Sequence, residues 1–159
     1  MGVDQVVVRP MAHIDRGAAT RLLDCRLGGC GQARLGELVD VLSLPGLVAF
    51  RGDRLEGVLT YRIDSDDCEL VAIATVQSQH GVGTRLVETL KAAGHERIWL
   101  VTTNDNVDAL RFYQRRGFRL ISLRPGGVEE SRRVKPQIPE TGAYGIPLRD
   151  ELLLEWRPK

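Results

Sequence analysis

A nearly continuous apolar segment, Glu69–Val76, is followed by a glycine-containing turn and then by an amphipathic segment, Val82–Ala93. An apolar run without polar alternation is typical of a strand that is buried on both faces. In the amphipathic segment the apolar residues recur at helical spacing, which predicts a helix packed on a sheet. Arg97–Thr102 is a second predicted buried strand. This strand–helix–strand order predicts a mixed α/β domain.

The rest of the chain continues this alternation of strand-like and helix-like segments. The tetrapeptide Arg51–Arg54 is predicted to be a hairpin turn in which Gly52 supplies a positive φ, and Gly117 is predicted to end a helix. Further strands are expected at Val6–Arg9, Leu47–Arg51, Leu55–Asp64, Arg119–Leu123 and Glu151–Trp156, and further helices at Ile14–Leu27, Ala33–Leu42 and Asn106–Arg116.

Composition narrows the class of protein. The chain has 159 residues with 22 Lys+Arg and 21 Asp+Glu, a balance that argues against a nucleic-acid binder. No apolar run reaches the ~18 residues of a membrane span, and the first ten residues do not predict a signal peptide. The spacing of the three cysteines fits no metal site, so buried or half-buried thiols are expected. One cytoplasmic domain over residues 1–159, without a metal and without a membrane partner, is therefore predicted.

The turn Gln77–Thr84 enters the predicted helix without an evident side-chain cap. Backbone N–H groups at a helix start bind anions, so a phosphate or pyrophosphate would satisfy them. The P-loop pattern needs a lysine before Thr84, and the dinucleotide pattern needs a glycine where Leu86 stands. A tight turn without a ligand remains the alternative for this motif alone.

A second informative segment is Thr103–Phe118. Asn106 and Tyr113 are seven residues apart, which places them on one face of a helix. The strand before this helix could bring both residues beside the glycine turn. The alternatives are that Asn106 caps the helix and that Tyr113 belongs to the core.

Together the two segments resemble the GNAT superfamily of acyl-CoA-dependent N-acyltransferases. The family's Gln/Arg-x-x-Gly-x-Gly/Ala pattern is matched at Gly81 and Gly83, whereas Ser78 departs from its first position. The family's second pattern, Asn-x-x-Ala-x-x-Phe-Tyr followed by Gly-Phe, is matched by Asn106, Ala109, Phe112, Tyr113, Gly117 and Phe118.

The resemblance implies a central mixed β-sheet that splays open at the acyl-CoA site and is flanked by helices. It implies acetyl-CoA as the acyl donor and no metal. The main chain of Val71, Ala72 and Ile73 would pair with the pantetheine arm. The remaining donor-binding residues that it implies are Ser78, Gln79, His80, Gly81, Val82, Gly83, Thr84 and Asn106.

The resemblance also assigns catalytic roles. Tyr113 matches the family's acid, and a phenol with a pKa of ~10 stays protonated at neutral pH. Glu69, at the start of the central strand, is the candidate base, with Asp66 and Asp67 as competitors. The alternative for Glu69 is an exposed carboxylate at a strand end. His80 is expected to act through its backbone donor rather than as a base.

The function implied is the transfer of an acetyl group from acetyl-CoA to an amine of a small molecule or peptide. A non-catalytic acyl-CoA-binding or sensing module on the same fold is the second hypothesis, and a nucleotide-binding domain is the third. The long segment 125–149 is expected to line the acceptor pocket or to form a contact between two copies of the chain. A disordered surface excursion is the alternative for this segment.

Overall fold

The computed structural model describes residues 5–77 and 80–159. The chain forms two compact units. The first comprises Met1–Cys30 with Asp40–His95, and the second comprises Gly31–Val39 with Glu96–Lys159. The single domain expected over residues 1–159 stays a prediction.

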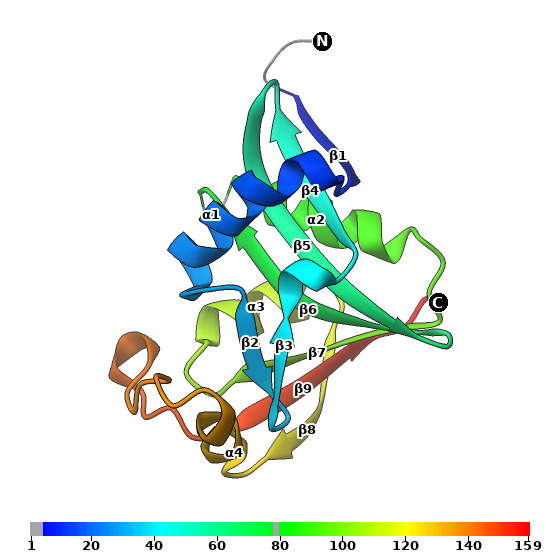
Figure 1. The fold of residues 1–159 in the computed structure, drawn as a ribbon. Helices are drawn as coiled ribbons and strands as arrows, with labels where there is room; N and C mark the ends of the chain where they lie inside the picture. Colours follow the sequence, from blue (N-terminus) through cyan, green and yellow to red (C-terminus); the bar gives the residue numbers. More distant parts are fainter. Residues whose placement is uncertain (1–4, 78–79) are drawn as a thin grey trace. The chain divides into compact units, whose positions relative to one another are not determined.

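The first unit is built on an antiparallel sheet in the order β1–β4–β5–β6 (Figure 1). Its strands are β1 (Val6–Pro10), β4 (Gly46–Arg51), β5 (Arg54–Asp64) and β6 (Asp67–Thr75). The predicted hairpin turn joins β4 to β5, and Gly52 has the predicted positive φ, 61°. Both halves of this hairpin therefore lie close to their predicted bounds.

Two helices of this unit pack on opposite faces of its sheet. They are α1 (Arg16–Leu27), which follows the short η1 (His13–Asp15), and α2 (Val82–Lys91); a second short helical turn, η2 (Val41–Ser43), precedes β4. Val58 of β5 belongs to one core cluster with Leu23 of α1. Its neighbour Gly57 lies under α2, because a Cβ built there would meet Val82 Cγ1 at 2.8 Å. Successive residues of a strand point to opposite faces, so α1 and α2 sandwich the sheet.

The second unit holds an antiparallel sheet in the order β7–β9–β8. Helix α3 lies between β7 and β8 in the sequence, and its Tyr113 is buried with Phe118. The elements are β7 (Arg97–Thr103), α3 (Val107–Arg115), β8 (Arg119–Arg124), α4 (Gly127–Val134), η3 (Ala143–Gly145) and β9 (Glu151–Trp156). Gly117 ends α3 with a φ of 91°, as predicted.

The helix predicted at Ala33–Leu42 is wrong. The structure has a hairpin there, made of β2 (Gly31–Arg34) and β3 (Glu37–Asp40). Leu35 and Gly36 form its turn with φ of 54° and 74°, a two-residue turn of the type that joins tight hairpins. The backbone N–H of Leu35 donates to Oε2 of Glu151 at 3.1 Å. This hydrogen bond joins residues that are 116 positions apart in the sequence, so no local sequence pattern predicts the turn.

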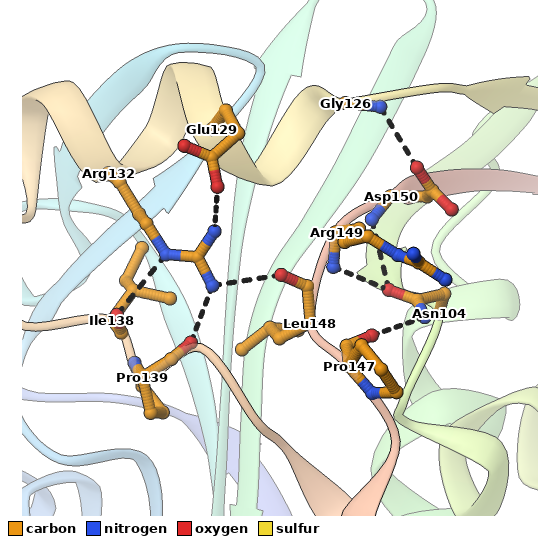
Figure 2. Close-up of polar contacts among 10 residues, drawn as sticks. All are labelled: Asn104, Gly126, Glu129, Arg132, Ile138, Pro139, Pro147, Leu148, Arg149 and Asp150. Carbon is orange, nitrogen blue, oxygen red and sulfur yellow. Dashed lines mark hydrogen bonds and ion pairs between the residues drawn. The ribbon is translucent and has the colours of Figure 1, made fainter.

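The segment 125–149 is ordered, so the disordered alternative is wrong. It contains α4 and η3, and the guanidinium of Arg132 ties its two ends together (Figure 2). That guanidinium donates to the carbonyls of Ile138 at 3.3 Å, Pro139 at 2.6 Å and Leu148 at 2.8 Å, and it pairs with Glu129. One side chain thus satisfies three backbone carbonyls of this segment.

Asn104, just after β7, holds the end of the same segment (Figure 2). Its Nδ2 donates to the carbonyl of Pro147 at 2.8 Å, and its Oδ1 accepts from the N–H groups of Arg149 and Asp150. Asp150 in turn accepts from the N–H of Gly126 at 2.9 Å. These bonds fix the path of the chain into β9.

The structure also bears on the burial of the three cysteines and on membrane-spanning helices. Cys30 is half-buried and Cys68 is buried, but Cys25 is exposed, which corrects the expectation for that thiol. Across residues 5–77 and 80–159, none of the helices combines the length and apolar character that crossing a membrane requires.

Candidate functional site

The predicted phosphate turn lies in the first unit, between β6 and α2. Ser78 and Gln79 lie outside the described residues. Gly81 is the N-cap of α2, with a left-handed φ of 80° and no side-chain cap. Because the first N–H groups of a helix have no acceptor within it, this start offers donors and a positive dipole end to an anion. The predicted absence of a capping side chain is confirmed.

The other residues predicted in this turn divide by exposure. His80 and Gly81 are exposed, whereas Gly83 and Thr84 are half-buried. Val82 is buried and packs over Gly57. The turn is thus anchored by Val82 and open at His80 and Gly81.

Gly57 decides how closely α2 approaches the sheet. A Cβ at this position would lie 2.8 Å from Val82 Cγ1 and 3.0 Å from Leu86 Cδ1. Both distances are shorter than normal packing allows, so only glycine lets the helix start lie at this height above β5. Leu86 fills core space here, where a dinucleotide fingerprint would need glycine.

The strand predicted to pair with the pantetheine arm carries a β-bulge. In the β5–β6 register Thr60 pairs with Ala72 and Tyr61 pairs with Leu70, so Val71 is the extra residue. A bulge bends its strand and re-aims backbone groups, and bulges are common beside active sites. Ala72 is buried, while Val71 and Ile73 are half-buried.

Glu69 is a buried, paired carboxylate. Its side chain is 3% exposed, and Oε1 lies 3.1 Å from Nη2 of Arg62, the residue opposite it on β5. The alternative of an exposed strand-end carboxylate is therefore wrong. Arg62 orients Glu69 and keeps its charge compensated. Of the competing bases, Asp66 is exposed and Asp67 is half-buried.

Asn106 and Tyr113 lie in the second unit. The Oδ1 of Asn106 accepts from the N–H of Ala109 at 3.2 Å, so Asn106 caps α3, as one alternative held. Its role toward a ligand stays a prediction. Asn106 is exposed, so its side chain is open to solvent as well.

Tyr113 has its ring in the core of the second unit. The ring packs edge-on against Phe112 at 5.1 Å and against Phe118 at 5.4 Å between centroids. Burial raises the pKa of the Tyr113 phenol above its ordinary value. The side chain can therefore serve only as a proton donor at neutral pH.

The sequence analysis missed a polar pocket beside the phosphate turn. Its volume is about 210 Å³, and its described lining residues are Arg51, Glu56, Gln77, His80 and Val82. Gln77, His80 and Val82 belong to the turn or to the start of α2, whereas Arg51 and Glu56 come from the β4–β5 hairpin. The sequence places Arg51 and Glu56 on the predicted hairpin but gives no signal that their side chains meet.

Comparison with known families gives a match to the acetyltransferase (GNAT) family over residues 29–118, more than half of the chain. Two Bacillus subtilis (strain 168) proteins are also similar, both described as uncharacterized. YdhI is 46% identical over 101 residues, which are 61% of this chain and 63% of that protein. YxbD is 44% identical over 106 residues, which are 64% of this chain and 67% of that protein. The match to YdhI thus spans less than two thirds of that protein, and the match to YxbD about two thirds.

Solved structures share the fold. An IAA acetyltransferase from Bacillus cereus ATCC 14579 has a TM-score of 0.70 at 23% identity, covering 97% of this chain and all (100%) of that one. A Bacillus subtilis acetyltransferase in complex with CoA has a TM-score of 0.66 at 19% identity, covering 98% of this chain and 100% of that one. The Escherichia coli ribosomal-protein-S18-alanine N-acetyltransferase has a TM-score of 0.67 at 14% identity, covering 96% and 94%.

These findings confirm the predicted fold class, a mixed α/β fold of the acetyltransferase type. The family match covers both the phosphate turn with α2 and the segment Asn106–Phe118, the two motifs that carried the resemblance. The chain belongs to the GNAT acetyltransferase family.

Proposed function

We propose that this protein transfers an acetyl group from acetyl-CoA to an amine of a small molecule or peptide. The observation that carries the proposal is the start of α2 at Gly81, where a left-handed glycine replaces a capping side chain and leaves helix donors facing outward. An anionic donor such as the pyrophosphate of CoA satisfies such donors. Structures of this fold have been solved with CoA or acetyl-CoA bound, which supports the same donor here.

The reaction is a direct attack of a neutral amine on the thioester carbonyl carbon. The C–N bond forms and the C–S bond breaks, and the amine nitrogen loses one proton. Tyr113 gives its phenolic proton to the departing thiolate, and the pKa raised by burial keeps the phenol protonated before this step. Glu69 takes the amine proton, directly or through a water, and Arg62 keeps its carboxylate oriented.

The second candidate function is a non-catalytic acyl-CoA-binding module. The pairing of Glu69 with Arg62 favours it, because the carboxylate of the candidate base is already engaged by a guanidinium. A cytoplasmic location is part of the proposal, and the free state of all three thiols is in keeping with it. We also propose that segment 125–149 lines the acceptor pocket or joins two copies of the chain.

The proposal is tested by mixing the purified protein with acetyl-CoA and a library of amines while free thiol is measured. Thiol release that depends on one class of amine is the expected result. Tight binding of acetyl-CoA without release for any amine would instead support the binding module. In Gly83→Val, a branched side chain stands where the backbone approaches the pyrophosphate, so acetyl-CoA affinity should fall sharply while the fold survives. Unchanged affinity in that folded variant would contradict the donor site.

A further inference from the structure

We propose that the polar pocket beside the phosphate turn binds a phosphate group of the acyl donor, with Arg51 as its cation. The inference rests on the proposed function, because it extends the donor site from the turn to the β4–β5 hairpin. Arg51 and Glu56 lie outside both sequence motifs. They would add a charged wall to a site otherwise made of backbone donors.

A β-bulge brings the two hairpin residues together. In the β4–β5 register Ala49 pairs with Gly57 and Phe50 pairs with Leu55, so Glu56 is the extra residue. Bulges redirect side chains, and here Oε1 of Glu56 accepts from Nε of Arg51 at 3.1 Å. The Glu56 side chain is 10% exposed and the Arg51 side chain is 30% exposed. The buried carboxylate thus holds the guanidinium at the wall of the pocket.

The remaining described lining suits an anion. Gln77 carries amide donors, and the exposed His80 carries a ring N–H donor. Val82 opens α2, whose start contributes a positive dipole end. Among the described lining residues, Glu56 is the one carboxylate, and its charge is compensated by Arg51. Guanidinium groups match phosphate geometry better than ammonium groups do.

The size of the pocket fits one group rather than a whole ligand. At about 210 Å³ it is smaller than the ~300–1,000 Å³ of pockets that enclose drug-sized molecules. It therefore accommodates a phosphate and its water, with the rest of the donor outside. The pyrophosphate and the ribose 3′-phosphate of CoA are the two sources of such a group.

The test measures binding of acetyl-CoA, acetyl-dephospho-CoA and S-acetylpantetheine by calorimetry. The main variant is the double substitution Arg51→Gln with Glu56→Gln, which removes both charges without leaving an unpaired carboxylate. The matched control is Arg54→Gln, which changes an exposed arginine on the same hairpin. Thermal unfolding is used to check that each variant is folded. If the double variant does not fold, the single variant Arg51→Gln is used in its place.

We expect acetyl-CoA to bind the double variant about 10-fold more weakly, the size of one charge-assisted hydrogen bond at a partly exposed site. S-acetylpantetheine, which has no phosphate, should bind both proteins equally, and Arg54→Gln should behave as the wild type. If the loss disappears with acetyl-dephospho-CoA, the group is the 3′-phosphate. If the loss persists, it is the pyrophosphate.

Two results would overturn the inference: unchanged acetyl-CoA affinity in the folded double variant, or an equal loss for S-acetylpantetheine. Failure of the proposed function has a different signature, because the wild type would then bind none of the three donors. Inorganic pyrophosphate is the independent probe in that case. Its binding to the wild type and loss in the double variant would support the phosphate pocket, and equal binding to both would refute it.

Discussion

Tyr113 has the structural properties of a proton donor rather than a base. Its ring is fixed between two phenylalanines, and burial raises its pKa, so the phenol keeps its proton at every pH at which the protein would work. Tyr113→Phe preserves the ring and removes the proton. We expect kcat to fall by about 10²–10⁴-fold, or slightly less, with little change in acetyl-CoA affinity. Full kcat under conditions where chemistry limits the rate would show that the hydroxyl is structural.

Glu151 is a residue whose protonation affects stability. Its side chain is 1% exposed; Oε2 accepts from Leu35 N and Ser131 Oγ, while Oε1 lies 3.4 Å from Arg124 Nε without a hydrogen bond. Burial, the largest influence, raises its pKa in the folded protein. A raised folded pKa means that the protonated form is favoured by folding. The stabilisation is thus fully present below the unfolded pKa of about 4.3 and is lost as pH rises through the folded pKa.

Glu151→Gln removes this titration, and the sign of the effect follows. As pH rises from about 4 to about 8, the Tm of Glu151→Gln should increase relative to the Tm of the wild type. Thermal unfolding at a series of pH values measures it. Glu140→Gln, at an exposed position, is the control and should follow the wild type more closely. Parallel curves for Glu151→Gln and wild type would mean that burial of this carboxylate has no effect on stability.

At the level of elements, the segment 125–149 depends on Arg132 for its order. The planar guanidinium reaches the carbonyls of Ile138, Pro139 and Leu148 at once (Figure 2). A lysine ammonium is a compact charge on a flexible stem and cannot reproduce this fork. We expect Arg132→Lys to lose about 1–3 kcal/mol of stability and to be cleaved faster between residues 135 and 149 by limited proteolysis. Arg133→Lys, at an exposed neighbour, should leave both unchanged.

Equal cleavage rates for Arg132→Lys and the wild type would contradict this role of Arg132. The same assay with a cognate amine present examines the proposed acceptor role of the segment. Protection by the amine would support that role. Rapid cleavage in every state, with the nicked enzyme fully active and unchanged in size, would contradict it.

For the whole molecule, local patterns predicted most elements. The apolar run of β6, the amphipathic spacing of α2 and the bounds of β9 follow from residues adjacent in sequence. The hairpin β2–β3 did not follow, because Leu35 adopts a left-handed turn that a bond to Glu151 supports. The resemblance proposed from two motifs was confirmed by the family match.

The candidate site was predictable in its backbone part and less so in its side chains. Gly81 and the uncapped helix start could be read from the sequence. The burial of Glu69 could not, because it depends on Arg62 on the neighbouring strand. Likewise, Arg51 and Glu56 meet through a bulge whose position no spacing rule gives. Which side chains meet across two strands is set by the register, and the register depends on side-chain packing. This limits how much of the site can be predicted from the sequence.

Binding of the donor should be visible in the stability of the whole protein. A ligand that binds only the folded state stabilises it by about 2.7 kcal/mol at a free concentration of about 100 Kd. For a chain of this size each kcal/mol shifts Tm by about 2–4 °C, so acetyl-CoA should raise Tm by about 5–11 °C. Differential scanning fluorimetry across a concentration series measures the shift. Gly83→Val should show little or no shift over the same series, because its turn no longer admits the pyrophosphate. An equal shift in both proteins would place acetyl-CoA elsewhere than at the start of α2.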